Sequence, residues 1–238
     1  MKHFYVLLSF FFLVSWQSFR SDKEAANPRD YLNDLKIELK KEWPKNKTIN
    51  LVFHGHSVPA GYFKTPTVNT LQSYPHQVLE QLKSLYPLAV INIINTSIGG
   101  ENSINGEKRF KNDVINHNPD VVFIDYSLND RGLGLEKSKI AWEKMIKLAL
   151  RKNIKVILLT PSPDMGVNIL DSNSVLNKHA EQVKSLSTKY NVGLIDSYAL
   201  FKEKATYGEG VINYMSQINH PNEKGHRLIS NEILTYFK

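Results

Sequence analysis

The sequence predicts an α/β fold in which one parallel sheet of five strands carries helices on both faces. Five short apolar runs are spaced along the chain, and longer amphipathic segments separate them. The runs are mainly apolar, as expected for the buried strands of a parallel sheet. The chain has 238 residues, of which 42% are hydrophobic, which is enough for one substantial core in a single domain.

The predicted strands are short β-branched or aromatic runs bounded by turn-forming residues. They cover residues 50–54, 90–95, 120–126, 154–160 and 192–196. Strands that alternate with helices along the chain predict a parallel sheet with helices on both of its faces.

The segments between the strands have apolar residues at helical spacing. The first predicted helix covers residues 30–43, with Leu32, Leu35, Leu39 and Trp43 on one side and Pro44 after its end. The other predicted helices cover residues 71–86, 104–117, 135–152, 173–190 and 222–237.

Residues 1–20 have the pattern of a signal peptide. Lys2 and His3 precede an apolar run over residues 4–16, which has the length of a signal-peptide core and is short for a membrane span. No clean pair of small residues marks a cleavage site, so an uncleaved membrane anchor remains the alternative. We therefore predict export to the periplasm or the extracellular space. Residues 21–48 would form a lead and a helix ahead of an α/β domain over 49–238.

The composition excludes several classes of protein and site. The chain has no cysteine, so disulfides, a thiolate nucleophile and a lipid-modified N-terminal cysteine are impossible. The formal net charge is +7, but the lysines are scattered and form no arginine-rich stripe, which argues against a nucleic-acid partner. His54 and His56 alternate across a strand end and face opposite ways, which argues against a metal pair. No glycine-rich loop suited to phosphate is present, and we expect no cofactor.

Polar and glycine-rich clusters follow the predicted strands at the point where each strand ends. They occupy residues 55–57, 95–100, 127–130 and 160–164, and a further cluster at 219–222 precedes the last helix. Because the carboxyl ends of parallel strands lie at one edge of the sheet, we expect these clusters to converge there.

The clusters contain the groups that an acyl-transfer site needs. Ser57 can act as the nucleophile, and His220 as the base that accepts its proton. The N–H groups of Ser57 and Gly100 and the side-chain amide of Asn129 can donate to an oxyanion. A glycine at position 100 lets a substrate oxygen approach the backbone closely. Taken alone, residues 55–57 fit equally well with a strand-to-helix turn in which Ser57 is only a cap.

Four sequence blocks between residue 50 and the C-terminus contain these candidate groups. The blocks are Gly55-His56-Ser57-Val58-Pro59-Ala60-Gly61-Tyr62, Asn95-Thr96-Ser97-Ile98-Gly99-Gly100-Glu101-Asn102-Ser103, Asn129-Asp130 and His220-Pro221-Asn222. In type and order they resemble the conserved blocks of the SGNH (GDSL-like) hydrolases, and Tyr74-Pro75 matches an aromatic–proline pair common in that family. The resemblance implies a flavodoxin-like three-layer α/β/α sandwich. It also implies hydrolysis of esters, often acetyl or longer acyl groups on sugars or lipids.

Two positions depart from the family pattern. The aspartate that precedes the family's nucleophile is His56 here, and the family's catalytic acid, three residues before the histidine, is Gln217. Glutamine can accept a hydrogen bond from the imidazole but adds no negative charge. In the serine-protease template, an acid-to-amide change costs about 10⁴ in rate.

Three explanations for Gln217 are open at this point. His220 works in a Ser–His dyad and is oriented by Gln217 or a backbone carbonyl, or Asp164 supplies the acid from the end of the fourth strand, or catalysis has been lost. We favour the dyad. Tyr62 either lines the substrate pocket or packs under its loop, and we interpret Asp130 as a hydrogen-bonded loop carboxylate.

The sequence therefore predicts an exported serine ester hydrolase that removes acyl groups, most simply acetyl groups, from a carbohydrate. Its substrate partner would be an acylated small molecule or polysaccharide. A lipid or thioester acylhydrolase and an inactive carbohydrate-binding protein are the alternatives, and a flavodoxin-like nucleotide binder is disfavoured. We expect no stable membrane insertion unless residues 1–20 are retained.

Overall fold

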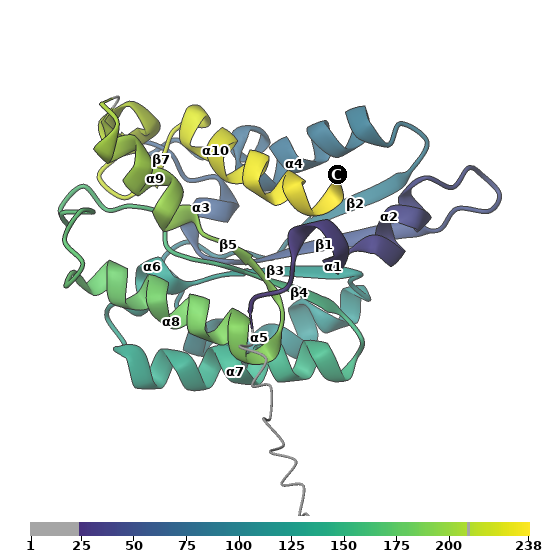
Figure 1. Cartoon of the computed structure of the whole chain (residues 1–238), viewed down its shortest axis with the longest axis horizontal. Coiled ribbons are helices and arrows are strands. Elements are labelled where there is room, and N and C mark those ends of the chain that lie inside the picture. Colours follow the sequence, from purple (N-terminus) through teal and green to yellow (C-terminus); the bar gives the residue numbers. More distant parts are fainter. Residues whose placement is uncertain (1–23, 209) are drawn as a thin grey trace, which may run out of the picture.

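The computed structural model describes residues 24–208 and 210–238, and it has the predicted α/β architecture (Figure 1). Its sheet contains five parallel strands in the order β2-β1-β3-β4-β5. They are β1 (Thr48–Gly55), β2 (Val90–Asn95), β3 (Val121–Asp125), β4 (Lys155–Leu159) and β5 (Gly193–Ile195). The chain moves from β1 outward to β2 and returns to β3 on the other side of β1. The carboxyl ends of β1 and β3 therefore flank the point where the direction of winding reverses, which is where open α/β sheets bind ligands.

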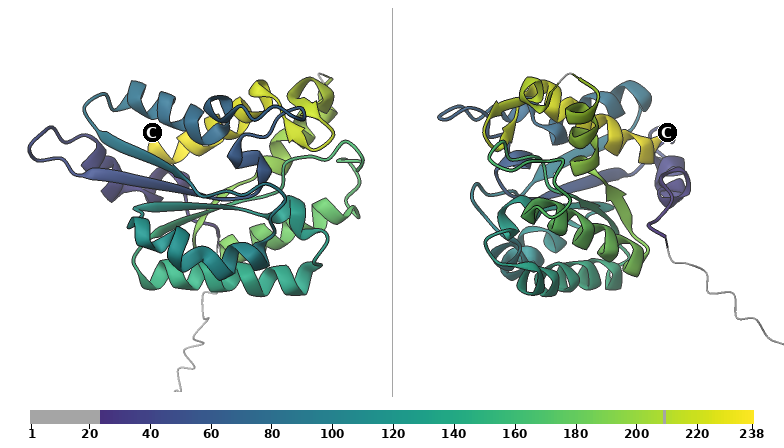
Figure 2. Two further views of the ribbon diagram at one scale, coloured as in Figure 1. Left: turned by 180° about the vertical axis from the view of Figure 1, so that it is seen from behind. Right: turned by 60° about the vertical axis from the view of Figure 1, so that its left-hand side comes forward.

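Helices cover both faces of the sheet (Figures 1 and 2). On one face, α4 (Tyr74–Leu85) packs beside α10 (Glu223–Leu234). The other face carries α5 (Ser103–Asp113), α7 (Leu135–Arg151) and α8 (Val175–Tyr190). The predicted three-layer sandwich is confirmed.

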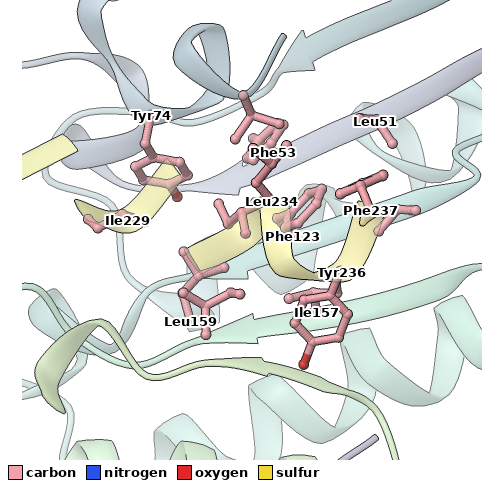
Figure 3. Packing of buried hydrophobic residues seen from close by; sticks show 14 of the residues in the cluster. Leu51, Phe53, Tyr74, Phe123, Ile157, Leu159, Ile229, Leu234, Tyr236 and Phe237 are labelled. Carbon is pink, nitrogen blue, oxygen red and sulfur yellow. The ribbon is translucent and has the colours of Figure 1, made fainter. Parts of the chain in front are cut away.

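The side chains of each strand divide between two buried clusters, one on each face of the sheet. Phe53 of β1 belongs to the cluster under α4 and α10, and the adjacent Val52 belongs to the one over α5 and α7. In the first cluster, Phe53 stacks on Phe123 of β3 with ring centroids 4.3 Å apart (Figure 3). In the second, Trp142 of α7 is buried. Burial on both faces explains why the inner strands are mainly apolar, whereas every residue of the edge strand β2 is exposed or half-buried.

Several shorter elements complete the fold. They are α1 (Pro28–Tyr31), α2 (Asn33–Leu39), α3 (Ser57–Ala60), α6 (Ser127–Asp130), α9 (Ser197–Thr206), the 3₁₀ turns η1 (Thr70–Gln72), η2 (Ile115–His117), η3 (Val211–Tyr214) and η4 (Thr235–Phe237), and the antiparallel pair β6 (Met215–Gln217) and β7 (His220–Pro221).

The predicted helix over residues 30–43 is wrong in its extent. The helix starts earlier, because the side chain of Asn27 accepts the N–H of Arg29 at 2.9 Å and Pro28 occupies the first turn. It is interrupted at Leu32, whose φ of −109° and ψ of 23° are not helical, and the second piece ends at Leu39. Apolar spacing showed that a helix exists here, but it did not show where the caps lie.

The helix α9 and the strands β6 and β7 are absent from the sequence-based prediction. Asp196 starts α9, since its Oδ1 accepts the N–H of Ala199 at 3.1 Å. Strands of two or three residues are too short to show a period of two. The long helices lie close to their predicted ranges, and the residues after α5 and α10 form the 3₁₀ turns η2 and η4. The short helices α3 and α6 were not predicted.

The predicted signal peptide, residues 1–20, lies outside the described residues. Within residues 24–208 and 210–238, no helix is both long and apolar enough to cross a membrane.

Candidate active site

Ser57 lies at the carboxyl end of β1, where the chain leaves the sheet and enters α3. At Gly55 a Cβ would lie 2.4 Å from the carbonyl oxygen of Asp125, so only glycine fits. His56 caps α3, with its Nδ1 accepting the N–H of Val58 at 3.2 Å. The cap is therefore His56 and not Ser57. Ser57 is the first residue of α3, and its own N–H has no acceptor within the helix.

His220 reaches Ser57 from the C-terminal part of the chain. Its Nε2 lies 2.9 Å from Oγ of Ser57, and both residues are mostly buried. A serine that donates this hydrogen bond needs an Nε2 without a proton. Burial lowers the pKa of His220 below its usual 6.5; the carbonyl of Phe63 opposes this shift and the nearby His56 adds to it. The imidazole is therefore neutral at neutral pH, as a general base must be.

The other ring nitrogen of His220, Nδ1, faces two groups. The carbonyl oxygen of Phe63 is 3.0 Å away, and the side-chain Nε2 of Gln217 is 2.6 Å away. The amide oxygen of Gln217 is engaged elsewhere, because it accepts from the backbone N–H and the hydroxyl of Thr65 at 3.0 and 3.2 Å. When Nε2 accepts from the serine, the ring proton sits on Nδ1 and needs an oxygen acceptor. The carbonyl of Phe63 provides that oxygen, and Gln217 does not.

The loop of residues 62–68 carries this carbonyl and is held on several sides. The N–H of Phe63 donates to the carbonyl of Thr67 at 3.1 Å, and Thr65 is bound to Gln217. The ring of Phe63 stacks on the buried ring of His226 with centroids 5.1 Å apart and an interplanar angle of 22°. Gln217 therefore acts on the loop that orients His220.

Asp164 is committed to other partners. Its Oδ2 pairs with Nη1 of Arg131 at 2.5 Å, and its Oδ1 accepts the N–H of Gly166 at 2.8 Å. Among the described residues, the carbonyl of Phe63 and the side-chain amide nitrogen of Gln217 are the groups within hydrogen-bonding distance of His220 Nδ1. The arrangement does not place Asp164 in the role of the acid.

Three donors lie on the loops around Ser57. The N–H of Ser57 is the first. Gly100 has a φ of +76°, a conformation that glycine adopts without strain, and no atom lies within 4 Å of where its Cβ would be. Asn129, in α6 at the end of β3, donates one amide hydrogen to the carbonyl of Glu101 at 2.8 Å, which fixes its side chain beside the Gly100 turn.

Tyr62 lines the site instead of packing under its loop. Its ring is partly exposed, at 39%, and lies 6.0 Å from the ring of His220 between centroids. It also covers Gly99, where a Cβ would come within 2.7 Å of the tyrosine ring. Tyr62 therefore stands between the histidine and the glycine turn, at the surface that a substrate would contact.

Asp130, the last residue of α6, connects the start of α5 to α7 inside the protein. Its Oδ1 accepts the N–H of Ser103 at 2.8 Å, and its Oδ2 accepts from Nε1 of Trp142 at 2.7 Å. The carboxyl is fully buried, and burial raises its pKa although the hydrogen bonds oppose the shift. This matches the prediction of a hydrogen-bonded carboxylate, although the residue ends a short helix and does not lie in a loop.

His56 has a buried partner on β3. Its Nε2 lies 3.3 Å from Oδ1 of Asp125, whose Oδ2 accepts from the hydroxyl of Tyr74 at 3.0 Å. Burial, and then the carboxylate of Asp125, raise the pKa of Tyr74, which keeps this phenol protonated. The position before the nucleophile thus anchors α3 to the sheet and to α4.

No group of three or more His, Cys, Asp or Glu side chains in residues 24–208 and 210–238 could hold a metal ion. His54 is engaged by Oγ1 of Thr96 at 2.8 Å and by the carbonyl of Gly106 at 3.1 Å, apart from His56.

Sequence reasoning offered a backbone carbonyl as one possible partner of His220 but did not identify it as that of Phe63. The contributing group is a main-chain oxygen, which has no residue type, so no motif could have pointed to it. The loop of residues 62–68 places this oxygen beside His220.

Similarity to known proteins agrees with this geometry. Over residues 53–228 the chain matches the GDSL-like lipase/acylhydrolase family, and the matched span includes Ser57, Gly100, Asn129 and His220. The chain belongs to this family. Membership makes it a carboxylic ester hydrolase.

Solved structures similar to this GDSL-like hydrolase include carbohydrate esterases. Axe2, an acetylxylan esterase from Geobacillus stearothermophilus, has a TM-score of 0.70 at 21% identity, covering 83% of this chain and 96% of Axe2. A two-domain esterase active on acetylated mannans, CEX, has a TM-score of 0.69 at 21% identity, covering 87% of this chain and 52% of its own. At these identities the likeness establishes the fold. No curated protein matches the chain.

Axe2 and this GDSL-like hydrolase have different residues three positions before a histidine. The catalytic mutants of Axe2 replace a serine, an aspartate or a histidine, and the aspartate precedes the histidine by three residues. Gln217 holds that position here.

Proposed function

We propose that this GDSL-like hydrolase removes acetyl groups from an acetylated carbohydrate, with Ser57 and His220 as a catalytic dyad. The observation that carries the proposal is the 2.9 Å contact between Oγ of Ser57 and Nε2 of His220. On the other side of the ring, the carbonyl oxygen of Phe63 lies 3.0 Å from Nδ1. The choice of substrate is supported by the fold shared with Axe2 and with the mannan esterase.

The reaction proceeds through an acyl-enzyme. Ser57 attacks the ester carbonyl while His220 takes its proton at Nε2, and the Nδ1–H stays bonded to the carbonyl of Phe63. The N–H groups of Ser57 and Gly100 and the amide of Asn129 stabilise the oxyanion. The intermediate collapses, the sugar oxygen leaves with the proton from His220, and a sugar hydroxyl is released. Water then attacks the acetyl-serine with His220 again as base, which releases acetate and restores Ser57.

The Phe63 carbonyl preserves the tautomer that catalysis needs but supplies no negative charge. In the serine-protease template, the amide variant loses about 10⁴ in rate because the ring adopts the wrong tautomer. Here the Phe63 carbonyl can accept from Nδ1–H, whereas the amide nitrogen of Gln217, 2.6 Å from Nδ1, can bond only to the tautomer without that proton. The productive tautomer has an oxygen acceptor, so we expect a rate penalty smaller than about 10⁴.

The test is turnover of a series of aryl esters and of acetylated xylo- and manno-oligosaccharides. We expect acetyl esters to be preferred over longer acyl chains, acetate to be released from the oligosaccharides, and Ser57→Ala to be inactive while its thermal unfolding is unchanged. Preference for long chains would favour a lipid acylhydrolase instead. Near wild-type turnover by Ser57→Ala would exclude Ser57 as the nucleophile.

A carbohydrate-binding protein without catalysis is the second candidate, and the observation that favours it is Gln217 at the position of the acid. A fluorophosphonate probe separates the two functions, because only an activated serine is labelled. Labelling of the wild type but not of Ser57→Ala supports the enzyme. A wild type that stays unlabelled supports the binding protein.

We also propose that the enzyme acts outside the cytoplasm, in the periplasm or the extracellular space. The support is the apolar run over residues 4–16 after Lys2 and His3. Fractionation of cells expressing the full chain, with N-terminal sequencing of the exported form, tests export and also distinguishes cleavage from anchoring. Recovery in the cytoplasmic fraction would exclude export.

A further inference from the structure

The turn that carries Gly100 is tied to the sheet and to the interior. The N–H of Glu101 donates to the carbonyl of Ile98 at 3.2 Å, which closes a four-residue turn, and the N–H of Ile98 donates to the carbonyl of Gly55 at 3.0 Å. Gly100 is the third residue of this turn and has the positive φ that this position favours. The orientation of its N–H therefore depends on how firmly Ile98 and Glu101 are held.

The carboxylate of Glu101 is turned into the protein and bound by an arginine of α5. Nε of Arg109 donates to Oε1 and Oε2 at 2.8 and 3.0 Å, and Nη2 of Arg109 also donates to Oε2. The hydroxyl of Tyr126 donates to Oε2 at 2.8 Å. The side chains are only 8% exposed for Glu101 and 16% for Arg109. A buried arginine–carboxylate pair of this kind fixes the position of the Glu101 side chain and also adds charge-assisted hydrogen bonds.

The main chain of Glu101 serves a second oxyanion donor. Its carbonyl accepts from Nδ2 of Asn129 at 2.8 Å, and its N–H follows directly after Gly100 in the chain. Glu101 thus connects the backbone donor of Gly100 with the side-chain donor of Asn129. Any movement of Glu101 would displace both donors relative to Ser57.

We propose that the Arg109–Glu101 pair is a positioning device for the oxyanion hole, holding the Gly100 N–H and the Asn129 amide in their working geometry. The inference rests on the proposed ester hydrolysis at Ser57. A buried ion pair adds little net stability on average, since desolvation offsets its attraction. The pair can still fix the geometry of two donors, even though it adds little to the stability of the fold.

The same arginine provides a matched control. Nη1 of Arg109 also pairs with Asp113 one turn further along α5 at 3.1 Å, and that carboxylate is 43% exposed. Asp113 touches neither the glycine turn nor Asn129. Asp113→Asn and Glu101→Gln each remove one carboxylate partner of Arg109. Only Glu101→Gln changes a residue of the turn that carries Gly100.

The experiment compares Glu101→Gln, Tyr126→Phe and Asp113→Asn by steady-state kinetics on an aryl acetate and by ¹⁵N order parameters of the Gly99 and Gly100 amides. In Glu101→Gln we expect kcat to fall about 10–100-fold, somewhat less than on deleting a donor outright. KM should stay within about twofold, because an oxyanion forms only in the transition state. The order parameters should fall too. Asp113→Asn should change kcat by less than about twofold and leave the glycine amides as they are, and Tyr126→Phe should lie between the two.

The inference is overturned if Glu101→Gln loses no more kcat than Asp113→Asn, if its loss appears in KM alone, or if the glycine amides are as ordered as in the wild type. Should Glu101→Gln fail to fold, Tyr126→Phe decides, and unchanged kcat in that variant would overturn the inference. A wild type without turnover would instead refute the proposed function. In that case the order parameters alone would decide whether Arg109 holds the turn.

Discussion

His220 rests its Nδ1 proton on the neutral carbonyl of Phe63, 3.0 Å away, while Gln217 occupies the place of the family's acid. Burial holds the pKa of His220 below 6.5. Because the base must be neutral, kcat/KM should rise with pH through this pKa and be flat above it. The acid limb of the wild-type profile is therefore expected below pH 6.5.

Gln217→Asp should move that limb to higher pH. A carboxylate near Nδ1 favours the imidazolium, so it raises the pKa of His220, and it also stabilises the charge that forms on the ring during attack. We expect kcat above pH 8 to equal or exceed that of the wild type. The measurement is the pH dependence of kcat/KM for both proteins, with Gln217→Ala as the control for loss of the Thr65 contact. A limb that stays in place or moves to lower pH would contradict this account.

Asp164→Asn should leave most of the activity in place. The carboxylate holds Arg131 and the N–H of Gly166 and does not contact the ring of His220. We expect kcat to change by less than about tenfold, far from the 10⁴ that loss of a catalytic acid costs. Steady-state kinetics with a parallel unfolding curve decide the point. A collapse of kcat in a folded variant would restore Asp164 as the acid.

Four site residues could be predicted from the sequence because each lies in a local block at a strand end: Ser57, Gly100, Asn129 and His220. The structure brings Ser57 and His220 within 2.9 Å, although 163 positions separate them in the chain. The orientation of Gln217 could not be predicted, because Thr65 sets it through a loop with no sequence signature. The role of each residue in catalysis stays a prediction until the variants are measured.

At the scale of elements, Tyr62 in the loop after β1 packs directly on Gly99 in the loop after β2. Tyr62 covers Gly99 so closely that a Cβ there would come within 2.7 Å of the ring. Gly99→Ala should therefore displace Tyr62 and raise KM, since the ring borders the site. In a Tyr62→Ala background, Gly99→Ala should add little.

A double-mutant cycle on kcat/KM checks this contact. We expect a coupling of about 0.5–3 kcal/mol between the two positions, as for residues in direct contact. Additive effects would mean that Tyr62 does not depend on the glycine beneath it.

The elements that apolar spacing reveals are the ones predicted correctly. The inner strands β1, β3 and β4 are mostly buried, and the long helices repeat their apolar pattern over several turns. The edge strand β2 has no fully buried residue, but its isoleucines and valine still mark it as a strand. Elements defined by caps or by a single buried side chain were mispredicted or missed. Leu32 is fully buried at the break between α1 and α2, and its apolar side chain looked like part of a continuous helix. In α9, the start depends on the side chain of Asp196.

Across the whole molecule, two buried histidines couple folding to pH. Burial lowers the pKa of His54 and of His226 to about 3 each. In the unfolded chain they take up protons near 6.5, the usual histidine value. Below pH 6.5 the unfolded state therefore binds more protons than the folded one. Above pH 6.5 both histidines are neutral in the folded and the unfolded state, so their contribution to stability is complete there. As the pH falls from 6.5 towards 3, protonation of the unfolded chain progressively lowers the free energy of unfolding.

The slope that each histidine contributes should grow from about 0.7 kcal/mol per pH unit at pH 6.5, where the unfolded side chain is half protonated, to about 1.4 kcal/mol per pH unit near pH 5. Urea unfolding at pH 7.5, 6.5, 5.5 and 5.0 measures the combined slope. His54→Gln should reduce the slope, since it removes one of these two histidines while His226 and His220, whose pKa is also lowered, remain. Equal slopes in the variant and the wild type would show that His54 does not govern the acid sensitivity.

The oxygen that receives the Nδ1 proton of His220 belongs to the peptide backbone, and this affects how the enzyme can vary. Any amino acid placed at position 63 still carries that oxygen, so saturation mutagenesis would identify Ser57 and His220 as intolerant without revealing their partner. Substitutions would instead cause small losses of activity at several positions that hold the loop in place, such as Thr65 and Gln217. One-residue insertions and deletions within 62–68, and not substitutions, are the lesions that would remove this catalytic group.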